Sequence, residues 1–128
     1  KCLPADVNVA YDPNFPEVFE KRNSAMLGHG VVLSKYTGAR GKSGTSDASA
    51  EFVSFVTNSF DHDNVAWQMA ELGKVDLGGG GTVAKFIAKA NIDTVDLGVP
   101  VISMHAPYEV VSKIDVYMTH KAIKAFYR

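Results

Sequence analysis

Cysteine is nearly absent from this sequence, which contains a single one, Cys2. One thiol cannot form an internal disulfide, and it cannot build a structural zinc site from several thiolates. The sequence also lacks any run of about 18 apolar residues, the length of a membrane-spanning helix, and its first residues lack the apolar stretch of a secretion signal. We therefore expect a cytoplasmic protein without a membrane partner.

An excess of charge of one sign is missing too. The chain carries 13 Lys and Arg against 14 Asp and Glu, which leaves a net charge of -1. No basic surplus draws the whole chain to a phosphate backbone, so we expect no nucleic-acid partner. With 128 residues, 46% of them hydrophobic, the chain is typical of one globular domain. It starts without Met and turns apolar at Leu3, which indicates a fragment of a longer chain.

Two hydrophobic periodicities alternate along the chain. Polar–apolar alternation and short apolar runs predict strands over residues 6–11, 30–36, 65–72 and 92–103. Apolar residues three and four positions apart predict helices after an N-cap at Ser46 or Asp47, over residues 83–90 and over residues 113–126. Strands this apolar need a helix layer on each face, so the pattern predicts an α/β fold with a covered sheet.

Two aspartates flank the first predicted strand. Asp6 lies near its start, and Asp12 lies in the turn after it, before Pro13. A carboxylate is a hard ligand for zinc or magnesium, and an acid in an apolar strand costs desolvation energy unless a cation or donors compensate it. Asp6 therefore fits a metal ligand and a hydrogen-bonded turn residue equally well. Asp12 fits a turn former better.

His105 follows the last predicted strand, where α/β sheets commonly place functional groups. Imidazole binds zinc well, but a lone His in such a place is structural about as often as it is a ligand. The other histidines are weaker candidates. His29 lies in a glycine loop and His120 on the last helix. The run Asp61-His62-Asp63 fits a solvated loop better than a metal site, because adjacent side chains at a helix end diverge.

Two segments could hold an anion. The glycine run from Gly78 to Gly81, ahead of Thr82, would present backbone N–H groups before a helix. It lacks the Lys-Ser/Thr of a Walker loop and does not match G-x-G-x-x-G, so a tight connection without a ligand is the better interpretation. Lys35, Arg40 and Lys42 could clamp an acidic group, although a solvated basic loop is the simpler interpretation. The sequence contains no Ser-His-Asp elbow and no H-E-x-x-H helix.

Taken in order, five segments resemble the carboxyl-terminal part of the aspartyl or vacuolar aminopeptidase I family, and most closely its bacterial branch. These segments are residues 5–14, 32–36, 70–74, 79–82 and 98–105. The resemblance extends over essentially all 128 residues. Its most specific pieces are the Asp-x-x-x-Ala motif that begins at Asp6 and the Met-His pair that ends at His105.

The resemblance implies a two-zinc aminopeptidase that removes amino-terminal residues from peptides. The resemblance implies a catalytic domain that is a three-layer α/β/α sandwich of the phosphorylase/hydrolase-like type. Residues 1–128 would be the carboxyl-terminal segment of that domain. The complete enzyme would be a homo-oligomer. In the family, an Asp at the position of Asp6 binds one zinc and a His at the position of His105 binds the other. Lys35 matches a family lysine near the substrate pocket, which makes it a candidate substrate contact.

The chain also departs from the family pattern. The eukaryotic branch has histidines where this chain has Val9 and Asp12, so the resemblance leaves the preference of that branch for acidic residues open for this chain. The family's remaining zinc ligands and its Glu-Glu pair would precede residue 1, and we expect no peptidase activity from this chain alone. A second hypothesis is a noncatalytic α/β module that binds an anion through Gly78 to Gly81. A third is a structural segment that associates with a partner.

Overall fold

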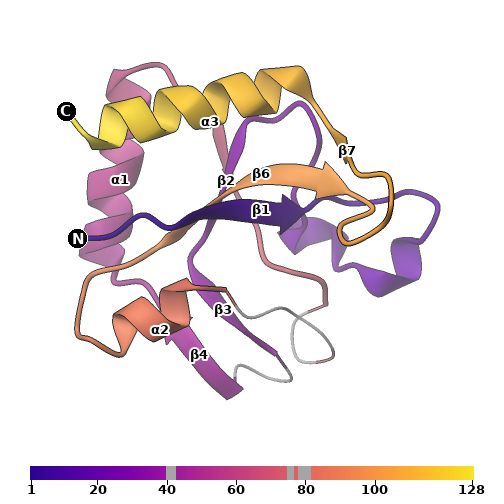
Figure 1. The fold of residues 1–128 in the computed structure, drawn as a ribbon, viewed down its shortest axis with the longest axis horizontal. Coiled ribbons are helices and arrows are strands. Elements are labelled where there is room, and N and C mark those ends of the chain that lie inside the picture. The colour runs from indigo at the N-terminus through magenta and orange to yellow at the C-terminus, as the bar shows by residue number, and fades with distance from the viewer. Residues whose placement is uncertain (40–42, 75–76, 78–81) are drawn as a thin grey trace.

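The computed structural model describes residues 1–39, 43–74, 77 and 82–128. Along this part of the chain the elements are β1 (Ala5–Val9), the 3-10 helices η1 (Pro16–Val18) and η2 (Lys21–Asn23), β2 (Val31–Ser34), β3 (Tyr36–Ala39), β4 (Ser43–Asp47), α1 (Ala50–His62), β5 (Trp67–Met69), α2 (Ala84–Ala88), β6 (Asp96–Ile102), β7 (Val110–Val111) and α3 (Lys113–Phe126). Figure 1 shows how these elements surround a central sheet.

Strand β6 is the centre of a mixed five-stranded sheet. It pairs in parallel with β1, where Val9 lies opposite Val101, and antiparallel with β2, where Leu33 lies opposite Leu97. β5 extends the sheet parallel to β2, and β7 pairs with the end of β6. β3 and β4 form a separate antiparallel hairpin.

Pro100 lies inside β6, although proline has no N–H for a strand ladder. Pairing between β2 and β6 ends at Gly98, and pairing between β7 and β6 begins at Val101. On that side of β6, Pro100 therefore lies between two pairing segments, where no ladder hydrogen bond is lost. For this reason β6 continues through Gly98 and Pro100, although both residues interrupt the sequence pattern of a strand.

Helices α1 and α3 pack on one face of the sheet. α1 begins after Ser49, whose side chain accepts a hydrogen bond from the N–H of Phe52 at 3.2 Å, as an N-cap does. Phe52, Val56 and Phe60 recur every four residues and are at most 2% exposed. They share one core cluster with buried residues of the strands and of α3, which include Val31, Leu33, Val95, Leu97, Ala122 and Ala125.

The opposite face of the sheet carries shorter elements. Side chains alternate along β2, so Val32 points away from the main core and packs with Ala25 and Ala70 in a second cluster. Ala25 follows η2 closely, and the N–H of Glu71 donates to the carbonyl of Asn23 in η2 at 2.7 Å. The segment with the 3-10 helices therefore covers this end of the second face.

The start of α2 covers the other end of the second face. Asp96 alternates with the core residue Leu97, so its side chain points to the second face, where it accepts a hydrogen bond from the Thr82 hydroxyl. The N–H of Ala84, the first residue of α2, also interacts with this carboxyl. The predicted three-layer α/β/α architecture is confirmed, with α1 and α3 in one outer layer.

Several predicted boundaries differ from the structure. The predicted N-cap at Ser46 or Asp47 was wrong, because both residues belong to β4 and pair with β3, and α1 starts after Ser49 instead. The predicted basic loop contains the β3–β4 hairpin, whose two strands flank Arg40 and Lys42; these two residues lie outside the described ranges, as do Gly78 to Gly81. The predicted helix over residues 113–126 is confirmed.

No helix in the described ranges is long and apolar enough to cross a membrane.

Asp115, in the first turn of α3, is fully buried and holds a glycine turn of the chain against that helix. Its Oδ2 accepts the N–H of Gly28 at 2.7 Å, and its Oδ1 accepts the N–H of Gly30 at 2.8 Å. Gly30 has a φ of +92°, and a Cβ at this position would lie 2.1 Å from the carbonyl oxygen of Ala66. Glycine is therefore required at residue 30, and the Asp115 carboxylate fixes the entry into β2.

Replacing Asp115 with Ala is expected to lower the free energy of unfolding by about 3 kcal/mol, because the buried N–H of Gly30 and the partly buried N–H of Gly28 both lose their acceptor. Asp115→Asn keeps one acceptor oxygen and should lose less. Urea denaturation of the purified protein measures both changes. Asp93→Ala, at an exposed position, is the matched control. Equal stability of the Asp115→Ala and Asp93→Ala variants would contradict this role.

Candidate metal centre

Asp6 presents its carboxylate on the exposed part of β1. The side chain is exposed, and its Oδ1 accepts the N–H of the next residue, Val7, at 2.8 Å. Asn8 lies two residues further on and shares the face of Asp6, but it is buried, with 4% exposure. β1 therefore carries one accessible carboxylate beside one enclosed amide.

The close approach of β1 to β6 depends on Gly98. Gly98 lies opposite Asp6 in the strand register. A Cβ added to Gly98 would lie 3.0 Å from the Cβ and from the backbone N of Asn8, which is tighter than ordinary packing. Only glycine lets the two strands approach in this way, so Gly98 sets the position of both polar residues of β1.

The orientation of the Asn8 amide follows from its hydrogen bonds. The Ser34 hydroxyl donates to the carbonyl of Ala70 at 2.9 Å, so its only proton is used there. Ser34 Oγ must then accept from Asn8 Nδ2, at 2.6 Å. Asn8 Oδ1 consequently points elsewhere, and it has no donor among the described residues.

Asp96 is the second buried acceptor on this face. It lies opposite Ser34 in the antiparallel β2–β6 pair, so the two side chains share a face. Its Oδ2 accepts from Thr82, and its Oδ1, like Asn8 Oδ1, lacks a donor within the described part of the chain. Asn8, Ser34 and Asp96 therefore form a buried polar cluster beneath the second face of the sheet.

The environment of Asp96 disfavours its charged form. Burial raises the pKa of its carboxyl to about 6, and the negative charge of Asp6 acts in the same direction. The Thr82 hydroxyl and the Ala84 N–H oppose this increase by hydrogen bonding to the carboxylate. A cation near Asp6 would weaken the repulsion between the two carboxylates, although burial raises the pKa of Asp96 more than Asp6 does.

His105 lies in a turn beyond the end of β6. Ser103 and His105 both adopt the left-handed region, with φ of +60° and +68°, and the His105 N–H donates to Glu109 Oε1 at 2.7 Å. Its side chain is exposed. Asp6 pairs with Gly98 of β6. Ile102, the last residue of β6, is four residues further on, or about 13 Å at roughly 3.3 Å per residue. The two predicted zinc ligands thus lie at opposite ends of the β1–β6 pairing.

The donor types of Asp6 and His105 fit zinc, which takes carboxylate oxygens and imidazole nitrogens. A zinc site needs at least three protein ligands, however, and the described residues contain no group of three or more His, Cys, Asp or Glu side chains that could hold an ion. This chain therefore offers exposed single donors rather than a complete set.

Lys35, the predicted substrate contact, directly follows Ser34 of the buried cluster. Its Nζ forms an ion pair with Asp47 Oδ1, at the end of β4. The Lys35 side chain is 40% exposed. Solvent can therefore reach it although it is paired with Asp47. The structure thus pairs the predicted substrate contact with Asp47, a residue whose sequence context had predicted a helix N-cap.

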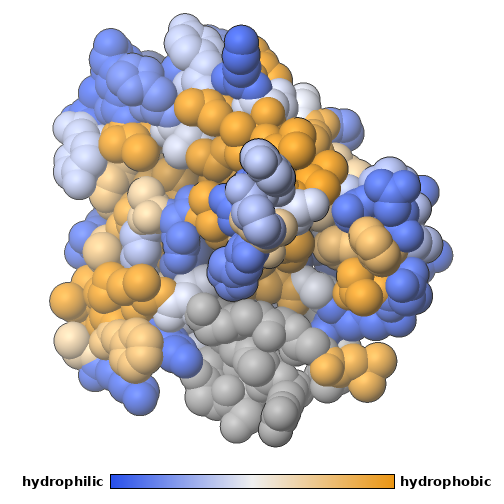
Figure 2. Space-filling model, turned by 45° about the vertical axis from the view of Figure 1, so that its right-hand side comes forward, coloured by the Kyte–Doolittle hydropathy of each residue, from blue (hydrophilic) through white to orange (hydrophobic). Residues whose placement is uncertain are grey.

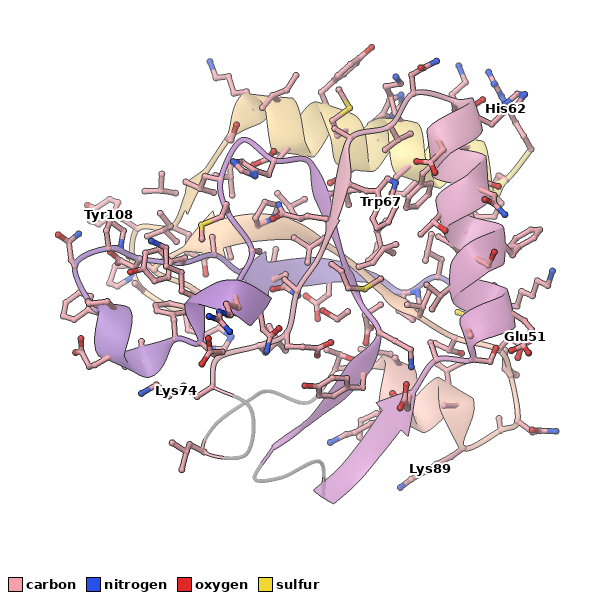
Figure 3. All side chains as sticks on the ribbon, turned by 180° about the vertical axis from the view of Figure 1, so that it is seen from behind. Glu51, His62, Trp67, Lys74, Lys89 and Tyr108 are labelled. Carbon is pink, nitrogen blue, oxygen red and sulfur yellow. The ribbon has the colours of Figure 1, made fainter. Side chains whose placement is uncertain are left out.

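The remaining histidines do not join these groups. Figure 3 shows His62 at the end of α1 and Tyr108, from the loop after His105, on opposite sides of the molecule. The His62 hydrogen bond and the Arg128 guanidinium lower the pKa of Asp63, although partial desolvation opposes them. Asp61 accepts instead from Trp67 Nε1 at 2.8 Å, so the side chains of the Asp61-His62-Asp63 run have different partners. His29 and His120 are exposed and have no described acidic partner.

Sequence reasoning missed the buried polar cluster. Asp96 had a detectable signal, because an acid inside the apolar run from Val95 to Ile102 must be hydrogen-bonded or uncharged. The roles of Asn8 and Ser34 had no local signal, since these residues are 26 positions apart and meet only through the sheet.

The raised pKa of Asp96 predicts a pH dependence of stability. The carboxyl binds a proton more tightly in the folded than in the unfolded state, so its contribution is fully present below pH 3.8 and is lost as the pH rises through about 6. The loss should reach up to roughly 2 kcal/mol, allowing for solvent screening. Urea denaturation in chelator from pH 4 to pH 7 should show this decrease in the wild type and not in Asp96→Asn.

Carboxyl carbon NMR provides an independent check, with a midpoint near 6 expected for Asp96. A midpoint near 3.8, or the same pH dependence in the wild type and in Asp96→Asn, would contradict the effect of burial.

The chain matches known proteins in sequence and in fold. The chain is 51% identical over 126 residues to a probable M18 family aminopeptidase 1 of Clostridium acetobutylicum, which covers 98% of this chain and 27% of the relative. It is 29% identical over 127 residues to vacuolar aminopeptidase 1 of Saccharomyces cerevisiae, covering 98% of this chain and 24% of the relative. The chain thus spans about a quarter of the length of these curated relatives.

Solved structures show the same fold. The crystal structure of aminopeptidase I from Clostridium acetobutylicum superposes with a TM-score of 0.93 at 50% identity, covering 98% of this chain and 28% of that one. An M18 family aminopeptidase from Thermotoga maritima gives a TM-score of 0.90 at 47% identity, covering 94% and 27%. The sequence model of the aminopeptidase I zinc metalloprotease family (M18) matches residues 1–127. Because that match extends over nearly the whole chain, this chain belongs to the M18 aminopeptidase I family of zinc metalloproteases.

Proposed function

We propose that this chain is the carboxyl-terminal segment of the catalytic domain of a zinc aminopeptidase, which hydrolyses amino-terminal residues from peptides. The observation that carries this proposal is the family match over residues 1–127, together with the superposition on a bacterial aminopeptidase I at a TM-score of 0.93. The chain spans about 28% of that protein, so the remaining parts of the active site come from outside residues 1–128.

Asp6 and His105 each contribute one ligand, to two different zinc ions. Their donor chemistry and their exposure support this assignment. Bound zinc would polarise the scissile carbonyl as a Lewis acid. Asn8 and Gly98 hold β1 against β6 and thereby position Asp6, and Lys35 binds the substrate from the end of β2.

The complete enzyme is a homo-oligomer in the cytoplasm. One structural relative, at 25% identity, is described as the dodecamer of a Saccharomyces cerevisiae aminopeptidase 1. Large apolar side chains remain exposed in this chain, among them Val83, Phe86, Val110, Val111 and Ile114. Figure 2 shows apolar surface in several areas of one face of the molecule. Exposed apolar patches are typical of protein contacts, and this surface fits contact with the rest of the domain and with other subunits.

The purified 128-residue chain is expected to bind zinc weakly and to hydrolyse no aminoacyl anilide. The described residues contain no group of three metal-binding side chains, and the proposed assignment places the general base outside residues 1–128. Assays with and without added zinc, at equal protein concentration, measure this. Robust zinc-dependent turnover by the chain alone would refute the assignment as a partial catalytic domain.

In the intact enzyme, Asp6→Asn and His105→Ala should each lower the zinc content by about one ion per subunit and reduce kcat by roughly 100-fold or more. Asp12→Asn and His120→Ala are the matched controls, because Asp12 accepts hydrogen bonds within its own turn and His120 is exposed on α3. Elemental analysis and anilide hydrolysis give the two readouts. Full zinc occupancy in both ligand variants would exclude these residues as ligands.

A further inference from the structure

The Lys35–Asp47 ion pair is held by backbone contacts on both sides. Lys35 connects β2 to β3, and its carbonyl accepts the N–H of Ala48 at 2.7 Å. Asp47 is the last residue of β4 and lies opposite Tyr36 in the hairpin. The two side chains therefore meet because the hairpin closes next to the end of β2.

This pair is linked through the backbone to the polar cluster of Asn8, Ser34 and Asp96. Lys35 follows Ser34, and Ser34 is hydrogen-bonded to Asn8, two residues after Asp6 in β1. Ser34 also lies opposite Asp96, whose carboxyl interacts electrostatically with Asp6. Lys35 is thus one residue along the chain from Ser34, which connects β2 to the strands that carry Asp6 and Asp96.

The pair is solvent-accessible and easily separated. The Lys35 side chain is 40% exposed and that of Asp47 is 59% exposed. Ion pairs with such exposure contribute little to stability, so another anion can compete with Asp47 for the ammonium group. An acidic substrate side chain at Lys35 would have to displace the Asp47 carboxylate or lie beside it, and like charges side by side repel each other.

We propose that Asp47 is a specificity-determining residue, which by pairing with Lys35 favours substrates with a neutral amino-terminal side chain over substrates with an acidic one. The inference rests on the proposed aminopeptidase function and names its substrate class. Asp47 positions the Lys35 ammonium group, and its negative charge repels an acidic substrate side chain. It does not need to touch the substrate.

The test compares glutamyl and leucyl anilides as substrates of the intact, zinc-loaded enzyme. Asp47→Asn should raise the ratio of kcat/KM for the glutamyl over the leucyl substrate about fivefold, the factor expected for one exposed ion-pair contact. The change should appear mainly in KM for the glutamyl substrate. Asp47→Glu keeps the charge and should keep the wild-type ratio.

Two further variants separate this role from a general charge effect. Asp93→Asn removes one exposed carboxylate elsewhere on the chain and should leave the ratio unchanged. Adding Lys35→Met to Asp47→Asn should abolish the gain for the glutamyl substrate. An unchanged ratio in Asp47→Asn, or an equal increase in Asp93→Asn, overturns the inference while leaving the aminopeptidase proposal intact. Failure of the wild-type enzyme to hydrolyse either anilide overturns both.

Discussion

The parallel pairing of β1 with β6 is the constraint on which the rest of the molecule depends. β6 lies between β1 and β2, and it holds both against the core built by α1 and α3. Gly98 has no Cβ at the point where Asn8 approaches, which allows β1 to lie this close to β6. It determines which side chains of β1 are enclosed and which reach solvent. The exposure of Asp6 and the burial of Asn8 are both consequences of this one contact.

Burial of polar groups gives the second face of the sheet its chemistry. Asn8, Ser34 and Asp96 lie in a region where an unpaired carboxylate is unfavourable, and the pKa of Asp96 is raised for that reason. Above about pH 6 the buried carboxylate of Asp96 therefore adds a negative charge to a face that also carries the exposed Asp6. The proposed zinc ligand Asp6 lies on this face, and the chain belongs to a family of zinc metalloproteases.

Much of the fold could be predicted from local patterns. The apolar stripe of α3 predicted a helix over residues 113–126, because a helix that covers a core repeats its apolar residues every three to four positions. The β3–β4 hairpin was missed, since its sequence is rich in glycine and basic residues and lacks alternation. The N-cap of α1 was placed too early, because Ser46 and Ser49 are equally good caps in isolation and the strand pairing of Ser46 decides between them.

The sequence by itself determined the fold class and the family resemblance, and it identified Asp6, His105 and Lys35 as candidate site residues. Motifs and hydrophobic periodicity suffice for this, because both are formed by residues that are close together in the sequence. Only the tertiary structure decided that Asn8 would meet Ser34, that Asp96 would feel the charge of Asp6, and that Lys35 would pair with Asp47. These contacts join strands that are distant in sequence. Their geometry and electrostatics follow from the strand register and from burial, which no local pattern contains.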